Sequence, residues 1–335
     1  PFSKKINSGE DLLGTDSRLF YNAILAHRNS SNAAFCCGAG SIHRRKALES
    51  LVLNSRKRLS ELNSNIFIDA EKVKNKKFAI TASSNGVITG PFVHHISEDI
   101  YTSILLHSEK EKWKSYQHPD VECKMLSPQT LPDYVKQFSR YAEGTFDIFF
   151  SRDNPLIKKG LTPRQKLAYA ETIYSYFSPL WILIFLLSPI IFYFFLIPPI
   201  KAFNFDFFIR FLSLHLFSQL MVTTAHWGMS TKRAEQYYIG GFWIKLKALY
   251  KVIIGKKLQF NTTIKERKIN PLSYNLKFIY PHLVIIALTL IGLIYNGILI
   301  INETHPSYSA FFANTLWASY NIYLINPIVR AAFIK

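Results

Sequence analysis

Three polar side chains that could bind a sugar phosphate lie close together at Gln137, Arg140 and Tyr141. On a helix, at about 100° per residue, these positions share one face with Gly144. The planar guanidinium of arginine suits phosphate oxygens. The flat ring of tyrosine can stack on the C–H face of a sugar while its hydroxyl forms a hydrogen bond. Taken alone, the pattern is more typical of a surface helix than of a binding site. Other segments of the sequence must therefore decide between the two.

The helix that would carry these residues is predicted from Leu131 to Phe149. Thr130 and Pro132 are helix start signals. An apolar face lies about 110° from the polar face by the same rotation. Its members are Leu131, Tyr134, Phe138, Ala142, Thr145 and Phe149. We expect the apolar side to lie on membrane or protein, while the polar side points into a cleft.

Two acids, Glu98 and Asp99, follow Ser97 in a second polar cluster. A carboxylate within hydrogen-bond reach of an attacking hydroxyl can act as a general base. The same residues also fit a helix start, with serine as the N-cap and acids in the first turn. Both interpretations can hold together. His94 and His95 come just before, but adjacent histidines point to different faces, so we do not expect a metal site there.

The composition limits the classes of protein to which the chain can belong. The chain has 335 residues, a net charge of +18, 49% hydrophobic and 15% aromatic residues. A soluble protein this basic would suggest nucleic acid, but four long apolar stretches favour a membrane protein, and we expect no nucleic acid partner. The stretches are Tyr174–Pro198, Phe203–Trp227, Phe278–Ile301 and Tyr308–Phe333. Buried helices of a large soluble core remain the alternative.

Arg210 and His215 interrupt the second stretch, so it must face protein or water on one side. Basic residues crowd the 228–277 loop, whereas the two short turns on the other side hold only Lys201. The positive-inside rule therefore places residues 1–170, this loop and Lys335 on the cytosolic side. We expect a multi-pass protein of the plasma (inner) membrane.

Within the loop, Glu235–Ile254 alternates aromatic residues with lysines. The alternation predicts one helix on the cytoplasmic surface, with its lysines reaching lipid headgroups. The three cysteines, Cys36, Cys37 and Cys123, form no disulfide framework, which fits a reducing compartment.

Four segments together indicate a family. They are FCCGAGSIHRRKAL (Phe35–Leu48), ISEDIYTSILLH (Ile96–His107), QFSRY with the downstream DNPLIKKGLTPRQKL, and FNTTIK (Phe260–Lys265). In this order they resemble the FCGS, TED, QxxRW and FxVTxK motifs of processive family-2 glycosyltransferases of the cellulose synthase type. The chain departs from the motifs at Ala39, Ser97, Tyr141 and Thr262.

The resemblance implies a fold: the C-terminal part of an α/β GT-A-type glycosyltransferase domain, followed by interfacial helices and about four transmembrane helices. The implied units are the cytosolic part of the glycosyltransferase domain (1–128), interfacial helices with the QxxRY motif (129–172), transmembrane helices (173–228), a cytosolic interfacial helix with the gating loop (229–277), and transmembrane helices (278–335).

The resemblance also implies roles for residues. Asp99 would be the general base, with Glu98 as a supporting residue. Donor and acceptor binding would fall to Gln137, Arg140, Tyr141, Cys37 and Gly38. A gating loop with Phe260, Thr263 and Lys265 would fold over the bound nucleotide and exclude water. The smaller ring of Tyr141, where the family has tryptophan, would alter acceptor geometry or sugar identity.

The implied cofactor is Mg²⁺ or Mn²⁺. In the family, metal and uridine are held by aspartates upstream of FCGS, and no D-x-D pattern precedes Phe35. We therefore expect those ligands in a preceding half, and we expect residues 1–335 alone to be inactive. The implied partners are a UDP-sugar, the growing glycan, the lipid bilayer and accessory synthase subunits.

The function that these features predict is a membrane-embedded, inverting, processive hexosyltransferase that polymerises UDP-glucose into a β-glucan such as cellulose and translocates it. One alternative is the same architecture making a curdlan-, chitin- or hyaluronan-like polymer. The other is a non-catalytic polytopic transporter or scaffold, for which an intramembrane residue such as Arg210 would be suitable.

Overall fold

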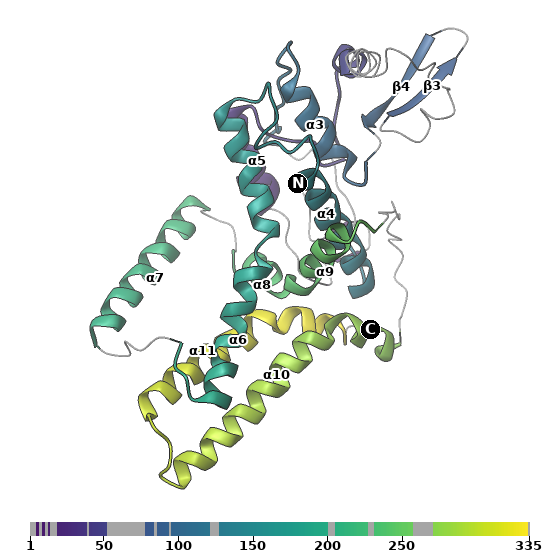
Figure 1. Ribbon diagram of the computed structural model, residues 1–335. Helices are drawn as coiled ribbons and strands as arrows, with labels where there is room; N and C mark the ends of the chain where they lie inside the picture. Colours follow the sequence, from purple (N-terminus) through teal and green to yellow (C-terminus); the bar gives the residue numbers. More distant parts are fainter. Residues whose placement is uncertain are drawn as a thin grey trace.

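The computed structural model is predominantly helical (Figure 1). It describes residues 5–6, 9–10, 13, 19–38, 40–51, 78–83, 86–93, 95–120, 127–199, 205–226, 231–256 and 271–333. Near the start of the chain, residues 19–38 contain a π-helical segment, η1 (Leu19–Leu25), and a 3₁₀ turn, η2 (Arg28–Ser31).

The strands of the described residues form two antiparallel hairpins. β1 (Lys5–Ile6) pairs with β2 (Gly9–Glu10), and β3 (Phe78–Ser83) pairs with β4 (Gly86–Val93). Parallel pairing, which an α/β domain of the GT-A type requires, does not occur within the part of the chain that the structure describes. The GT-A domain therefore stays a prediction.

Three helices make up most of the upper part of Figure 1: α3 (Glu98–Ser108), α4 (Leu131–Phe150) and α5 (Pro163–Tyr176). The predicted helix with the QFSRY residues is confirmed as α4. Its Thr130 side chain accepts a hydrogen bond from the Asp133 backbone, as an N-cap should. Thr162 and Gln165 form a reciprocal capping box that starts α5.

The aromatic and lysine segment is two helices, α8 (Lys232–Gly240) and α9 (Phe242–Ile253), so the prediction of one continuous helix over Glu235–Ile254 is wrong. The chain turns at Gly241 because the two halves pack on different partners. A Cβ atom at Gly240 would lie 2.9 Å from the Ile328 side chain of α11. α9 instead packs along α4, with Ala248 and Leu249 in one cluster with Ala142 and Phe146.

Four helices occupy the predicted apolar stretches: α6 (Pro179–Phe195), α7 (Phe205–Ala225), α10 (Leu272–Ile301) and α11 (Tyr308–Ala331). The first stretch is broken at Phe177 and Ser178, so Tyr174 belongs to α5. Among the described residues, two segments are long and apolar enough to cross a membrane, Pro163–Phe195 and Leu272–Ile301. Polar residues within α7 and α11 lower their hydropathy, and four spans stay a prediction.

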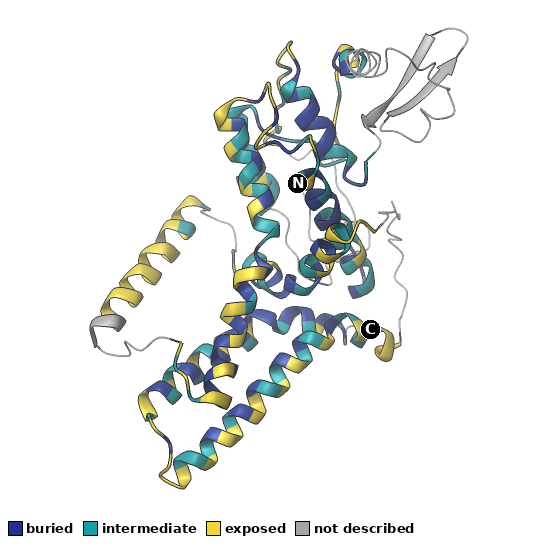
Figure 2. Ribbon diagram, in the orientation of Figure 1, coloured by how far each residue is buried: buried dark blue, intermediate teal, exposed yellow. Residues whose placement is uncertain are grey.

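The apolar helices differ in their surroundings (Figure 2). α6, α10 and α11 pack together through a cluster that includes Leu186, Ile285 and Ile325. The Asn296 side-chain amide of α10 donates to the Tyr193 carbonyl of α6 at 2.8 Å. α7 stands apart from them, and its described side chains are almost all exposed (Figures 1 and 2).

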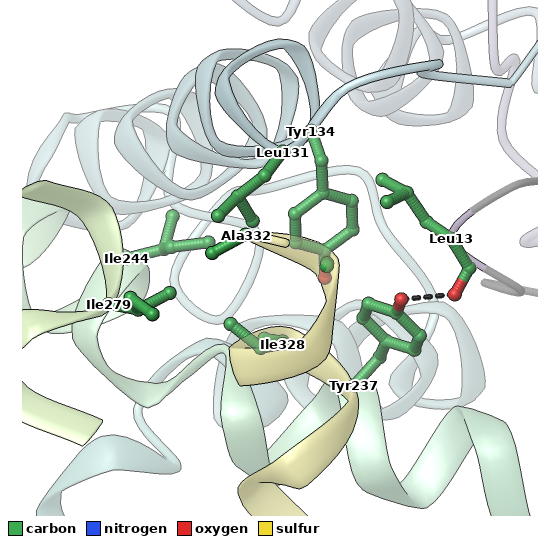
Figure 3. Close-up of a cluster of buried hydrophobic side chains, with 9 residues drawn as sticks. Leu13, Leu131, Tyr134, Tyr237, Ile244, Ile279, Ile328 and Ala332 are labelled. Atoms are coloured by element: carbon green, nitrogen blue, oxygen red, sulfur yellow. Dashed lines mark hydrogen bonds between the residues drawn. The ribbon is translucent and has the colours of Figure 1, made fainter. Parts of the chain in front are cut away.

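A buried cluster joins α4, α8 and α9 to the apolar helices α10 and α11 (Figure 3). Its members come from these five helices, from the N-terminal region and from the C-cap of α11: Leu13, Leu131, Tyr134, Tyr237, Ile244, Ile279, Ile328, Ala331 and Ala332. The Tyr237 hydroxyl donates to the Leu13 carbonyl. This cluster holds the start of α4 against α10 and α11, and α4 carries the candidate site.

Candidate active site

The N-terminus of α3 lies against the middle of α4. Nη1 of Arg140 donates to the Ile96 carbonyl at 3.3 Å and lies 3.9 Å from Oε2 of Glu98. One turn further along α4, a Cβ atom at Gly144 would lie 2.0 Å from Oγ of Ser97. The absence of a side chain at Gly144 is what lets the two helices approach this closely.

Ser97 occupies the N-cap position of α3, as predicted, but its side chain makes no capping hydrogen bond. Its buried hydroxyl has no hydrogen-bond partner among the described residues and lies instead against the backbone at Gly144. The packing of α3 on α4 thus overrides the local capping preference.

Asp99 is partly buried at this junction, and its Oδ1 accepts a hydrogen bond from the Ile100 backbone at 2.8 Å. Burial raises the pKa of the Asp99 carboxyl, because charge is costly away from water. The Ile100 N–H and the positive charge of Arg140 oppose that rise. Burial likewise raises the pKa of Glu98.

The FCCGA segment passes beside this carboxylate. A Cβ atom at Gly38, which has a φ of +85°, would lie 3.8 Å from Oδ2 of Asp99. Oγ of Ser103 on α3 donates to the Asp99 carbonyl at 3.0 Å and accepts from the Cys36 backbone at 2.9 Å. One serine therefore ties the segment to the turn of α3 that carries Asp99.

Gln137, Arg140 and Tyr141 are brought together on α4. Nε2 of Gln137 donates to the Tyr141 hydroxyl at 2.6 Å, and the Arg140 guanidinium lies 5.0 Å from the centre of the Tyr141 ring. Oε1 of Gln137 and Oε2 of Glu98 are buried without a hydrogen-bond partner in the described part of the chain. Such acceptors suit the hydroxyl donors of a sugar.

Tyr21, on η1, is a site residue that the sequence analysis missed. Its hydroxyl forms a hydrogen bond with the Cys37 thiol and lies close enough to Asp99 for the carboxylate charge to act on it. Burial raises the pKa of Tyr21 and that of Cys37, with Asp99 adding to both. Tyr21 is one of 18 tyrosines and belongs to none of the motifs, so no sequence pattern singles it out.

The predicted gating-loop residues Phe260, Thr263 and Lys265 lie outside the described residues. α9, which precedes them in the chain, is tied to α4 by an ion pair of 2.5 Å between Lys251 and the buried Glu143. Among the described residues, no group of three or more His, Cys, Asp or Glu side chains could hold a metal ion. The predicted Mg²⁺ or Mn²⁺ is therefore not assigned to any residue described here.

Residues 81–334 match the cellulose synthase family, which covers most of the chain and the whole α3–α4 junction. The chain belongs to the cellulose synthase family. It is thus a member of a glycosyltransferase family, as the order of its four segments predicts.

Individual family members are distant in sequence. The chain is 22% identical to the cellulose synthase catalytic subunit [UDP-forming] of Pseudomonas fluorescens, over 99% of this chain and 40% of that protein. It is 22% identical to the cellulose synthase 1 catalytic subunit [UDP-forming] of Komagataeibacter xylinus, over 94% of this chain and 37% of that protein. It is 28% identical to the cellulose synthase A catalytic subunit 9 [UDP-forming] of Oryza sativa, over 73% of this chain and 25% of that protein. The chain therefore spans less than half the length of these relatives.

Proposed function

We propose that this chain supplies the general base and the acceptor side of an inverting, processive glycosyltransferase that extends a β-glucan from UDP-glucose. The observation that carries the proposal is the partly buried Asp99 carboxylate between Gly38 and Arg140. In this reaction a hydroxyl oxygen at the non-reducing end of the glycan attacks C1 of the donor sugar. The bond from C1 to the diphosphate oxygen breaks, UDP leaves with the electron pair, and the hydroxyl proton passes to Asp99.

The surroundings of Asp99 support this role. A carboxylate whose pKa is raised by burial is a stronger base than a solvated one. Arg140 would stabilise the negative charge that develops on the departing diphosphate. Oε2 of Glu98 and Oε1 of Gln137, which accept no hydrogen bond among the described residues, would accept hydrogen bonds from sugar hydroxyls. The Tyr141 ring would stack on the acceptor sugar.

The proposal extends to the membrane. α6, α10 and α11 form a packed group directly below α4, joined to it by the cluster of Figure 3. A multi-pass bundle in the plasma (inner) membrane, with the site on the cytosolic side, would receive the glycan at the α4 face and conduct it across the bilayer. Accessory synthase subunits would take the product on the far side, and the FNTTIK loop would close over the donor.

The test compares Asp99→Asn with the wild type in membranes that contain the intact protein. Asparagine keeps the size of the side chain but removes the basic lone pair, so incorporation of labelled UDP-glucose into polymer should fall about 10²- to 10⁴-fold. Binding of the UDP-sugar and the level of inserted protein should stay close to wild type. Asp120→Asn, a change at an exposed residue, is the matched control.

Near-normal polymer synthesis by Asp99→Asn would rule out the proposed mechanism. A loss that follows the protein level alone would mean that Asp99 only stabilises the start of α3. Labelled UDP-N-acetylglucosamine, assayed in parallel, identifies the donor: incorporation of that sugar instead of glucose would contradict a β-glucan product.

A further inference from the structure

His95 joins α4 to the turn that precedes α3. Its Nε2 lies 2.8 Å from Oδ2 of Asp147 on α4, and its Nδ1 accepts a hydrogen bond from the Ser97 backbone N–H at 3.0 Å. The imidazole ring packs on the ring of Tyr101, with 4.8 Å between centroids, and its side chain is only 12% exposed. His95 itself lies in the segment that leads into Glu98 and Asp99.

These contacts fit one protonation state of the imidazole. Nδ1 must keep its lone pair to accept from the Ser97 N–H, so the single ring proton must lie on Nε2, where it is donated to Asp147. The arrangement therefore gives the two ring nitrogens different roles: Nε2 donates to Asp147 and Nδ1 accepts from Ser97.

Asp147 belongs to a stripe of α4 residues that hold the start of α3. Arg140, Gly144 and Asp147 are spaced four and three residues apart, so they lie on one face of the helix. They contact Ile96, Ser97 and His95 respectively. Arg140 and Gly144 fix one side of the turn, and the His95–Asp147 pair fixes the backbone N–H at its N-cap. Two residues later the chain reaches Asp99.

We propose that His95 and Asp147 are positioning residues, which orient the N-terminal turn of α3 and so hold the Asp99 carboxylate toward the acceptor hydroxyl. The inference rests on the function proposed above. It gives His95 a role other than metal binding, for which adjacent histidines are poorly suited. A displacement of about 1 Å in a reacting group can cost about 10²-fold in rate, so loss of this support should reduce turnover without affecting the donor site.

The decisive variants separate the two bonds of His95. Phenylalanine keeps the ring on Tyr101 but makes neither bond, so His95→Phe should lower kcat about 10-fold or more, with KM for UDP-glucose within about two-fold. In His95→Asn the amide oxygen can still accept from the N–H two residues ahead, as in an Asx turn. We expect His95→Asn to recover most of the lost kcat.

Variants of Asp147 give a second test of the same pair. Asp147→Asn retains an oxygen that can accept from Nε2–H and should stay within about three-fold of wild-type kcat, whereas Asp147→Leu should resemble His95→Phe. His118 supplies a matched control, since its Nδ1 also accepts from the N–H two residues ahead, that of Asp120, but in an exposed loop. His118→Phe should leave kcat unchanged.

The experiment uses the intact protein in membranes, with Asp99→Asn assayed in parallel. Wild-type kcat in His95→Phe or Asp147→Leu, together with an inactive Asp99→Asn, would overturn this inference and leave the proposed function standing. Activity of Asp99→Asn would instead remove the proposed function. If His95→Phe does not accumulate, Asp147→Leu and His95→Asn decide: normal kcat in Asp147→Leu, or a kcat in His95→Asn as low as that in Asp147→Leu, would overturn the inference.

Discussion

Gly144 of α4 and Ser97 of α3 are in direct contact: a Cβ atom at Gly144 would lie 2.0 Å from Oγ and 2.7 Å from Cβ of Ser97. The two residues are far apart in the chain, yet this contact sets how closely the SED turn approaches the QFSRY helix. The proposed base and the proposed donor-binding arginine therefore share one rigid junction, and its geometry depends on a residue without a side chain.

Gly144→Ala should disrupt that junction. The added methyl group cannot fit without displacing the SED turn, and a shift of about 1 Å is sufficient for about a 10²-fold loss of polymer synthesis. Gly297→Ala is the control, because an added Cβ at Gly297 in α10 would meet no atom within 4 Å. Replacing glycine by alanine in open space within a helix is worth about 0.5–1 kcal/mol in favour of alanine.

A second substitution tests the cause of the loss. Ser97→Gly removes both of the Ser97 atoms that the new methyl group would overlap, so the Gly144→Ala, Ser97→Gly double variant should recover part of the activity. Radioactive incorporation per inserted protein molecule measures all three variants. Wild-type synthesis by Gly144→Ala would show that the junction does not need this close approach.

Through its charge near Asp99, Arg140 should affect the pH below which the reaction slows. Burial raises the pKa of Asp99 and the charge of Arg140 lowers it. The base acts as a carboxylate, so activity is lost as pH falls through this pKa. Arg140→Gln removes the opposing charge, so the pH below which kcat falls should move upward, and the maximal kcat should also be lower. Arg140→Lys should move that pH less. Arg152→Gln, at an exposed position just after α4, should not move it, and an equal shift in Arg152→Gln would refute the effect of Arg140 on Asp99.

Cys37 should react slowly with alkylating reagents. Only the thiolate reacts, and burial, with help from Asp99, raises the pKa of Cys37 well above its ordinary value. In a background with Cys36→Ser and Cys123→Ser, modification by N-ethylmaleimide at pH 8 should be far slower than that of a cysteine introduced at exposed Tyr116. Tyr21→Phe should slow it further, because the Tyr21 hydrogen bond lowers the pKa of Cys37. Acceleration in that variant would contradict the contact.

Lys245 should make stability depend on pH. Its Nζ bonds the Ser175 carbonyl and the Ser178 hydroxyl at the α5–α6 break, at 3.2 and 2.9 Å, instead of reaching lipid as predicted. Burial lowers its pKa to about 7. Since the unfolded chain binds this proton up to a higher pH, the folded state should gain stability as pH rises from about 7 toward 10. Thermal unfolding in detergent should show this gain.

The gain should be absent in Lys245→Met and present in Lys247→Met, which changes an exposed lysine of the same helix. A pH dependence that persists in Lys245→Met would assign the effect to another group.

Membrane topology can be tested with single cysteines in an otherwise cysteine-free protein. Lys256→Cys follows α9 and Asn302→Cys lies in the exposed turn between α10 and α11. If α10 crosses the bilayer, as its length of 30 residues allows, an impermeant maleimide should label the two sites from opposite sides. Labelling of both from one side would rule out the proposed topology.

Local patterns in the sequence were sufficient for some features. The 3.6-residue period and the start signals at Thr130 and Pro132 predicted α4, and these depend on neighbours within a few residues. The apolar stretches predicted where α6, α7, α10 and α11 lie. The order of the FCCGA, SED, QFSRY and FNTTIK segments indicated the family, which the match over residues 81–334 confirms. The roles of the individual site residues stay predictions.

Only the tertiary structure shows which residues contact one another at the candidate site. Ser97 is an N-cap in sequence, but contact with Gly144 turns its hydroxyl away from the cap bond. Tyr21 joins Cys37 without belonging to a motif, and Lys245 turns inward although the lysine pattern predicts headgroup contact. The reason is physical: periodicity and capping follow from interactions a few residues apart, whereas these contacts depend on how helices pack across long sequence separations. Packing distances of a few ångströms then determine which polar groups lose water and which residues can share one turn.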